Sequence, residues 1–194
     1  TYSVCAPLDE PRVAGGIVES YGRLAAGLLA GLKLIGLEPA EAKPDYPDQP
    51  GSTSPVCFDG PARYEITLRT PGSNGILIPR KLLGSAQSRR LGGVLQHGTL
   101  PLHGEISRII DALKYEGPAE REAARAHLQG RALTLDTALG RPVSLEEMAE
   151  SMVAGFEQAL NLRLVPGDLM PSEWAAVERI RSGKYAADEW TFKR

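Results

Sequence analysis

The spacing of apolar residues divides the chain into a first part with the period of strands and a second part with the period of helices. Short runs that alternate, or that are rich in β-branched and aromatic residues, predict strands over 1–6, 64–69, 76–78, 81–88 and 94–102. The run Pro71–Gly75 is a turn signal, so the 76–78 strand is expected to pair back on 64–69 as a hairpin.

Helical periodicity appears once before most of these strands and then throughout the rest of the chain. A helix over Gly16–Leu37 would place on one face Ile17, Tyr21, Leu24, Leu28 and Leu32. Later helices are predicted over 118–128, over 133–139, from a capping box at Ser144, and from Ser172 through Ile180. A further apolar stripe is formed by Ile106, Ile109, Ile110 and Leu113.

This order of elements predicts an α+β fold, because a repeating βαβ protein would alternate strands with helices along the whole chain. We expect one domain over residues 1–194, with a helical C-terminal part from about residue 115. The proline-rich stretch Glu38–Pro55 predicts a long irregular loop, a feature that is often functional inside a compact domain.

Composition narrows the class without identifying the chemistry. With 22 Lys and Arg against 24 Asp and Glu, the net charge of −2 leaves no chain-wide basic footprint for nucleic acid. Two cysteines are too few for a disulfide scaffold, and the sequence contains no CxxC motif and no convincing histidine spacing for a metal. The apolar stretch near Leu24–Leu37 is too short and too mixed to span a bilayer, so a cytoplasmic protein is expected.

The residues that are the best candidates for catalysis lie between Ser54 and Leu102. Cys57 stands on a loop between two prolines, and a thiol there becomes a nucleophile if a nearby cation such as Lys81 stabilises its thiolate. The alternatives are a buried small hydrophobe for Cys57, a solvated charge for Lys81 and a hydrogen-bonded core histidine for His97. Cys5, in an alternating strand, is interpreted as a core residue.

Three motifs in this region resemble the lipoate–protein ligase and octanoyltransferase family. They are Cys57-Phe58-Asp59-Gly60-Pro61-Ala62-Arg63-Tyr64-Glu65, then Arg80-Lys81-Leu82-Leu83-Gly84-Ser85-Ala86-Gln87, then Leu95-Gln96-His97-Gly98-Thr99-Leu100. Similar flanking pieces are Thr1-Tyr2-Ser3-Val4, Glu19-Ser20-Tyr21 and the closing Lys184-Tyr185-Ala186-Ala187-Asp188-Glu189-Trp190. The resemblance therefore runs in order over nearly the whole chain.

The resemblance implies a mixed, mostly antiparallel sheet backed by helices, as in the catalytic domain of biotin and lipoate protein ligases. It also implies a tunnel for a medium-length acyl chain. Two chemistries occur in the family. Ligases activate lipoate with ATP and Mg²⁺, whereas octanoyltransferases carry octanoate on a cysteine and require no cofactor. Cys57 matches the cysteine of the second branch, which favours an octanoyltransferase.

By this resemblance, Cys57 would attack octanoyl-acyl carrier protein, and Lys81 would stabilise the thiolate and orient the acyl carbonyl. The acceptor would be a lysine of a lipoyl domain or of the glycine cleavage H protein. The remaining motif residues are expected to bind substrate: Gly84, Ser85, Ala86, Gln87, Gln96, His97 and Gly98. The arginines Arg80, Arg89 and Arg90 would either dock an acidic carrier or form a solvated strand edge, and the sequence leaves these alternatives open.

The chain departs from the family at its beginning. It starts at Thr1 without the basic, glycine-rich motif that usually precedes this segment and helps to wall the acyl pocket. We therefore expect an N-terminal segment to be missing or to be supplied by a second chain. Three alternative functions remain: an ATP-dependent lipoate ligase, an amidotransferase that moves octanoate from the H protein, and a non-catalytic subunit that binds lipoyl domains.

Overall fold

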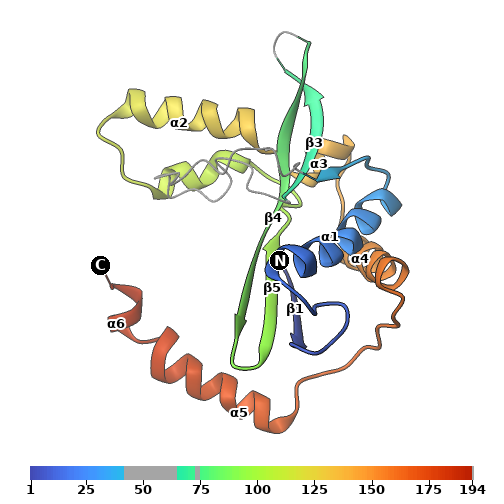
Figure 1. The fold of residues 1–194 in the computed structure, drawn as a ribbon. Coiled ribbons are helices and arrows are strands. Elements are labelled where there is room, and N and C mark those ends of the chain that lie inside the picture. Colours follow the sequence, from blue (N-terminus) through green and yellow to red (C-terminus); the bar gives the residue numbers. More distant parts are fainter. Residues whose placement is uncertain (42–64, 73–74, 194) are drawn as a thin grey trace. The chain divides into compact units, whose positions relative to one another are not determined.

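An antiparallel sheet and a layer of helices form the main part of the unit Thr1–Leu162 in the computed structural model, which describes residues 1–41, 65–72 and 75–193. The sheet has the order β1-β5-β4-β3-β2 (Figure 1). Its strands are β1 (Tyr2–Pro7), β2 (Ala40–Glu41), β3 (Ile66–Pro71), β4 (Leu77–Arg90) and β5 (Gly93–Thr99). All its strand pairs are antiparallel, which confirms the predicted α+β class.

Two hairpins that share the long strand β4 form the middle of the sheet. The first half of β4 pairs with β3 up to Leu83, and its second half pairs with β5 from Gly84 onwards. The two short strands predicted over 76–78 and 81–88 are therefore parts of one strand. Leu91 and Gly92 both have positive φ in the turn to β5, a conformation that suits the twist of a tight hairpin.

Two helices cover one face of the sheet. They are α1 (Ile17–Leu34) and α4 (Leu145–Leu160), and their apolar residues pack with Ile66, Leu82 and Leu83 into the main core. The predicted capping residue of α4 is confirmed, because Ser144 Oγ accepts a hydrogen bond from the backbone N–H of Glu147 at 3.0 Å. In α1 four of the five predicted face residues are buried, whereas Ile17, in the first turn, is 54% exposed.

Glycines allow α1 and α4 to approach closely. A Cβ added to Gly155 of α4 would overlap the backbone N of Gly31 and would lie 2.6 Å from the carbonyl oxygen of Gly27, both in α1. The same crossing is held by Ser151 Oγ, which donates to the Gly31 carbonyl at 2.8 Å. The helix layer therefore depends on the absence of side chains at these positions.

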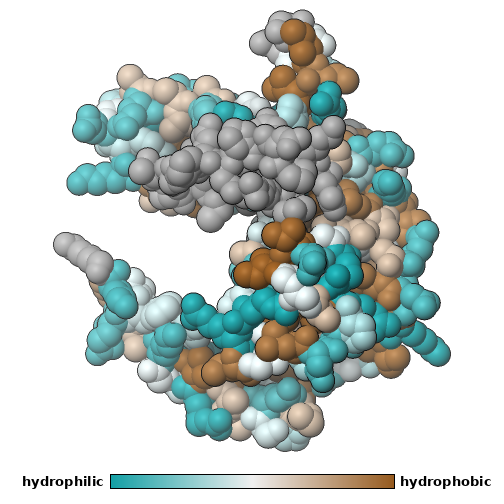
Figure 2. All heavy atoms as spheres, viewed as in Figure 1, coloured by the Kyte–Doolittle hydropathy of each residue, from teal (hydrophilic) through white to brown (hydrophobic). Residues whose placement is uncertain are grey.

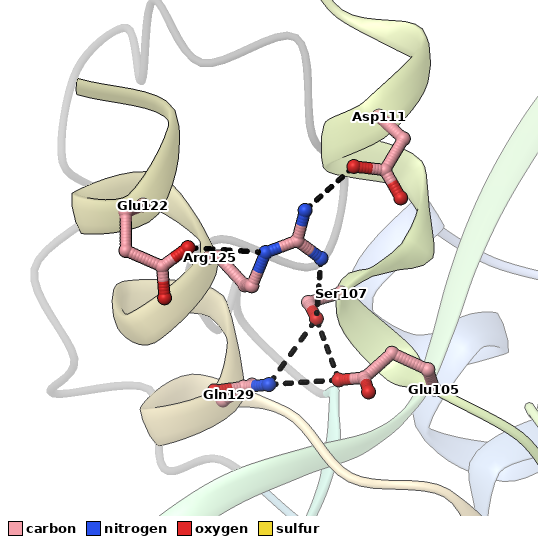
Figure 3. A network of polar contacts seen from close by, with 6 residues as sticks. All are labelled: Glu105, Ser107, Asp111, Glu122, Arg125 and Gln129. Carbon is pink, nitrogen blue, oxygen red and sulfur yellow. Dashed lines mark hydrogen bonds and ion pairs between the residues drawn. The ribbon is translucent and has the colours of Figure 1, made fainter. Parts of the chain in front are cut away.

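A smaller lobe follows the sheet. It contains the 3₁₀-helix η1 (Ile106–Ala112) and α2 (Pro118–Arg131). Ile110, Leu128 and Ala132 form a second, separate core there. The short helix α3 (Leu135–Leu139) comes next and packs against the main core through Leu135. Figure 3 shows the polar network that joins η1 to α2, in which Arg125 pairs with Asp111 at 2.5 Å.

The C-terminal residues Arg163–Arg194 form a separate compact unit. It contains α5 (Pro171–Ile180), the π-helix η2 (Arg181–Tyr185) and α6 (Asp188–Thr191). The predicted cap at Ser172 is wrong, because Pro171 begins α5 and Met170 precedes it as the N-cap residue. Within this unit the Lys184 ammonium lies over the rings of Tyr185 and Trp190, at 4.9 and 4.5 Å from their centroids.

The beginning of β4 exposes apolar side chains. Figure 2 shows hydrophobic residues gathered at that end of the β3–β4 hairpin, where Ile76 and Leu77 are 63% and 51% exposed. Among the described residues, none of the helices is both long and apolar enough to cross a membrane.

We predict that Gly155→Ala lowers the free energy of unfolding by about 1–3 kcal/mol, because the added methyl group meets backbone atoms that cannot move aside. The matched control is Gly22→Ala in α1, where a Cβ has open space and removal of a helical glycine is expected to stabilise by about 0.5–1 kcal/mol. Urea unfolding of both variants measures this difference, and equal stability of the two would contradict the close helix contact.

Candidate active site

A buried ion pair lies where β4 changes its pairing partner. Lys81 Nζ is 2.5 Å from Glu65 Oε1, and the two side chains are only 3% and 7% exposed. Glu65 directly precedes β3, and Lys81 pairs with Thr67 of that strand. Because removal of one partner would leave an uncompensated buried charge, breaking such a pair costs about 3–5 kcal/mol.

A β-bulge gives Lys81 its direction. The β3–β4 register passes from Ile66 opposite Leu83 to Thr67 opposite Lys81, which leaves Leu82 as the extra residue. In a regular strand Lys81 and Gly84 would point to opposite faces, since side chains alternate. The inserted residue brings the Lys81 side chain and the Cα of Gly84 to the same side.

Gly84 leaves the space that the ammonium group occupies. A Cβ at this position would lie 2.7 Å from Lys81 Cε and 3.0 Å from Lys81 Nζ. Any side chain at Gly84 would therefore displace the end of the lysine from its place beside Glu65. This position needs a glycine for close approach rather than for an unusual backbone angle.

Beside this pair, a chain of polar side chains runs through the helix-covered face of the sheet. The Tyr2 hydroxyl is 2.6 Å from Ser85 Oγ and accepts a hydrogen bond from Gln96 Nε2 at 3.0 Å. Gln87 Nε2 donates to Gln96 Oε1 at 2.9 Å, and Ser20 Oγ of α1 donates to Gln87 Oε1 at 2.8 Å. Burial raises the pKa of the Tyr2 phenol, an effect that its two hydrogen bonds partly oppose.

Gly98 is also required for close packing. A Cβ there would lie 2.6 Å from Ser85 Oγ and 2.6 Å from the Tyr2 ring. Gly98 stands opposite both Tyr2 in β1 and Ser85 in β4, so its missing side chain lets the tyrosine reach the serine.

Ala86 and His97 lie on the other face of the sheet. They are opposite each other in the β4–β5 register, and both are exposed. Cys5 is exposed as well, so its interpretation as a core residue is wrong. The apolar residues Val4 and Ala6 point inward from β1, and the alternation of the strand turns Cys5 outward.

The structure thus divides the predicted site residues into three groups. Lys81 and Gly84 meet at the ion pair, four residues lie along the chain of polar contacts that contains Tyr2, and two lie on the exposed face. Of these four, Ser85, Gln96 and Gly98 lie against Tyr2, and Gln87 is linked to it through Gln96. Cys57 lies outside the described residues. Substrate binding by these positions stays a prediction.

Two residues outside the predicted site set are important to it. Glu65 belongs to a motif that carries the resemblance, and the predicted hairpin between 64–69 and 76–78 is the signal that places it on the strand beside Lys81. Tyr2 belongs to a flanking segment of the resemblance. The signal for Tyr2 is its position on the inward-facing side of an alternating strand, where a phenol requires a polar partner.

The guanidinium groups of two arginines considered for docking are engaged within the protein. Arg80 donates to the carbonyl oxygens of Gln129 and Ala132, and Arg89 donates to the Val13 carbonyl at 3.0 Å. Within the described part of the chain, no group of three or more His, Cys, Asp or Glu side chains is arranged to hold a metal ion.

Comparison with known proteins agrees with this architecture. The model of the lipoyl protein ligase A/B catalytic domain matches residues 1–157. The chain is 33% identical to an octanoyltransferase LipM of Kyrpidia tusciae over 197 residues, and 31% identical to that of Bacillus subtilis over 198 residues. Each match covers 100% of this chain and 68% of the relative.

Solved structures show the same fold. A bi-partite lipoate protein ligase from Thermoplasma acidophilum has a TM-score of 0.72 at 17% identity, covering 97% of this chain and 61% of that one. A lipoate-protein ligase A bound with ATP has a TM-score of 0.68 at 19% identity, covering 97% and 62%. The chain therefore spans less than two thirds of these solved chains. From the matched family model and the similarity of the whole chain to about two thirds of its curated relatives, we conclude that the chain belongs to the lipoyl protein ligase A/B catalytic domain family.

Proposed function

We propose that this protein is an octanoyltransferase of lipoate synthesis. It takes octanoate from octanoyl-acyl carrier protein, holds it on Cys57, and transfers it to a lysine of a lipoyl domain or of the glycine cleavage H protein. Curated relatives that match the whole chain at 30–34% identity are octanoyltransferases, which supports this choice. Its cytoplasmic location stays a prediction.

The observation that carries the proposal is that Lys81 forms a buried ion pair with Glu65, and that this pair has no net charge. A nucleotide phosphate is bound best by cations that are free to form charge-assisted hydrogen bonds with it. Here a carboxylate lies 2.5 Å from the ammonium, so the charge of Lys81 is already engaged and is poorly suited to a polyphosphate. A thiolate or a thioester carbonyl needs only one oriented hydrogen-bond donor near it, which favours acyl transfer without ATP or Mg²⁺.

In the first step the Cys57 thiolate attacks the thioester carbonyl carbon of octanoyl-carrier protein. A new carbon–sulfur bond forms, the bond to the phosphopantetheine sulfur breaks, and the leaving thiolate takes up the proton given up by Cys57. Lys81 donates a hydrogen bond that stabilises the thiolate and orients the carbonyl. Exchange between two thioesters is nearly isoenergetic, so this step requires no ATP. Covalent capture on Cys57 divides one difficult transfer into two easier ones.

In the second step the neutral amine of the acceptor lysine attacks the octanoyl-Cys57 carbonyl. The carbon–nitrogen bond of the amide forms, the bond to Cys57 breaks, and the amine proton returns the cysteine to its thiol. Backbone N–H groups near Gly84–Ala86 are candidates for stabilising the oxyanion.

Three other functions remain as outcomes of the test. An ATP-dependent lipoate ligase would not require Cys57 and would use Mg²⁺ with its nucleotide. An amidotransferase would be acylated on the same cysteine by octanoyl-H protein rather than by the carrier protein. A non-catalytic subunit would bind lipoyl domains and modify none.

We predict that mixing the protein with octanoyl-carrier protein, in the absence of nucleotide, adds the mass of one octanoyl group, and that Cys57→Ser abolishes this adduct. Addition of a lipoyl domain or H protein then moves the group to the acceptor. Intact-mass spectrometry measures both steps. No adduct, together with lipoate- and ATP-dependent modification of the acceptor, would contradict the proposal, and full transfer by Cys57→Ala would refute the nucleophile.

We predict that Gly84→Ala slows octanoyl-adduct formation by about ten- to a hundred-fold, because the methyl group displaces the Lys81 ammonium from its position. Moving the ammonium also weakens its buried pair with Glu65, so the melting temperature is expected to fall, and the rates are compared at a temperature where the variant is folded. Gly93→Ala in β5 is the matched control, since a Cβ there meets only ordinary contacts at 3.5 and 3.8 Å. An unchanged rate in Gly84→Ala would show that the ammonium position does not matter.

A further inference from the structure

The edge of β4 beside Lys81 is covered by a segment that is not part of the sheet. On one edge Lys81 pairs with β3, and on the other the pairing with β5 begins only at Gly84. The connection after α2 occupies the space before that point. Ala132 forms a parallel bridge with Lys81, and the Leu133 N–H donates to the Lys81 carbonyl at 3.1 Å.

This connecting segment is among the most buried parts of the chain. Ala132, Leu133, Thr134 and Leu135 are each no more than 2% exposed. Ala132 belongs to the smaller core of the η1–α2 lobe, whereas Leu133 and Leu135 belong to the main core. The segment therefore joins the two cores at the position of the site lysine.

The neighbouring residue, Arg80, fastens this segment with its side chain. Its Nη2 donates to the carbonyl oxygens of Gln129 and Ala132, both at 2.6 Å, and its Nε donates to Ala132 at 3.2 Å. These carbonyls belong to the C-terminal end of α2, where the last backbone acceptors have no partner within the helix. A cation there also interacts favourably with the helix dipole.

Adjacent residues of β4 thus hold the same segment by different means, Arg80 through its guanidinium and Lys81 through its backbone. We propose that Arg80 is a positioning residue for Lys81: by capping α2 it keeps residues 129–133 against β4, and so keeps the Lys81 ammonium at its place beside Glu65. The planar fork of an arginine can reach two carbonyls at once, which the single ammonium of a lysine cannot do in the same geometry.

The lobe that contains α2 is held together by its own hydrogen bonds, so the carbonyl partners of Arg80 have a fixed position. The Gln129 side chain donates to Glu105 Oε1 at 2.7 Å, and Ser107 Oγ donates to the same oxygen at 2.6 Å (Figure 3). Arg125 joins α2 to Asp111 of η1. The backbone carbonyl of Gln129 accepts from Arg80, and its side chain donates to Glu105. Gln129 therefore connects Arg80 to the polar network of the lobe.

The inference deepens the proposed function, and its test includes a readout that does not depend on it. Arg80→Met and Arg80→Lys are compared with Arg12→Met, a matched control. Arg12 caps α4 in the same manner, donating to the carbonyls of Leu160 and Asn161 at 2.9 Å each, whereas the backbone bridge of Lys81 is with Ala132 after α2. Acetylation of Lys81 by an amine-reactive reagent is measured by peptide mass spectrometry, with the exposed Lys33 as internal reference.

For Arg80→Met we expect faster acetylation of Lys81 and a fall in kcat of octanoyl transfer of about ten- to a hundred-fold, with KM for the carrier protein unchanged. Arg80→Lys should lie between this variant and the parent. Arg12→Met should lower the melting temperature but leave the acetylation of Lys81 unchanged.

The proposal is overturned if Arg80→Lys remains folded and Lys81 is acetylated as slowly as in the parent protein. It is also overturned if Arg12→Met exposes Lys81 to the same extent, because both variants would then act through general destabilisation. Should the parent protein transfer no octanoate, the proposed function fails, and the acetylation rates still decide whether Arg80 positions Lys81.

Discussion

A lysine ammonium can remain inside this protein only because a carboxylate is held beside it. Removing both charges from water carries a large desolvation penalty, and only a close, well-oriented pair offsets it. The arrangement around Lys81 and Glu65 meets this requirement by several local devices. The bulge at Leu82 turns the lysine, Gly84 provides the space, and the connection after α2 satisfies the backbone of β4 where β5 does not reach.

Polar contacts elsewhere in the sheet keep the strands that carry these residues in one alignment. On the helix-covered face, polar side chains bind one another in a continuous series from Ser85 through Tyr2 and Gln96 to Gln87 and Ser20. Such a network specifies one alignment of β1, β4, β5 and α1, since a shift of one residue would leave buried polar groups without partners. The close contact of α1 with α4 in turn fixes the position of the helix that carries Ser20.

Local signals in the sequence were sufficient for much of the fold. The alternation of the strands, the hairpin that follows Pro71 and the cap at Ser144 act within a few residues, and each is confirmed. Errors arose where tertiary contacts decide the outcome. Ile17 shares the periodicity of the buried face of α1 yet lies in its exposed first turn. Cys5 has an apolar side chain, but the face of β1 that the core covers is that of Val4 and Ala6, so Cys5 points outward.

The site was predictable only in part for the same reason. The motif around Lys81 identifies the lysine, but the choice of Glu65 as its partner depends on a one-residue slip of register that no local pattern reveals. Similarly, Arg80 resembles a surface charge in the sequence, and only the end of α2, about fifty residues later, gives it carbonyl partners. Long-range pairing of this kind cannot be inferred from propensity or periodicity.

The most direct test of the central claim, that a neutral lysine–glutamate pair supports acyl transfer without a nucleotide, is the single-turnover rate of octanoyl-adduct formation in Glu65→Gln. The rate is measured by intact-mass spectrometry with octanoyl-carrier protein and no ATP, at a temperature where circular dichroism shows the variant to be folded. We predict a rate about a hundred-fold below that of the parent protein, because the ammonium loses the charge that holds it in place. A folded Glu65→Gln variant that forms the adduct at the parent rate would contradict the claim.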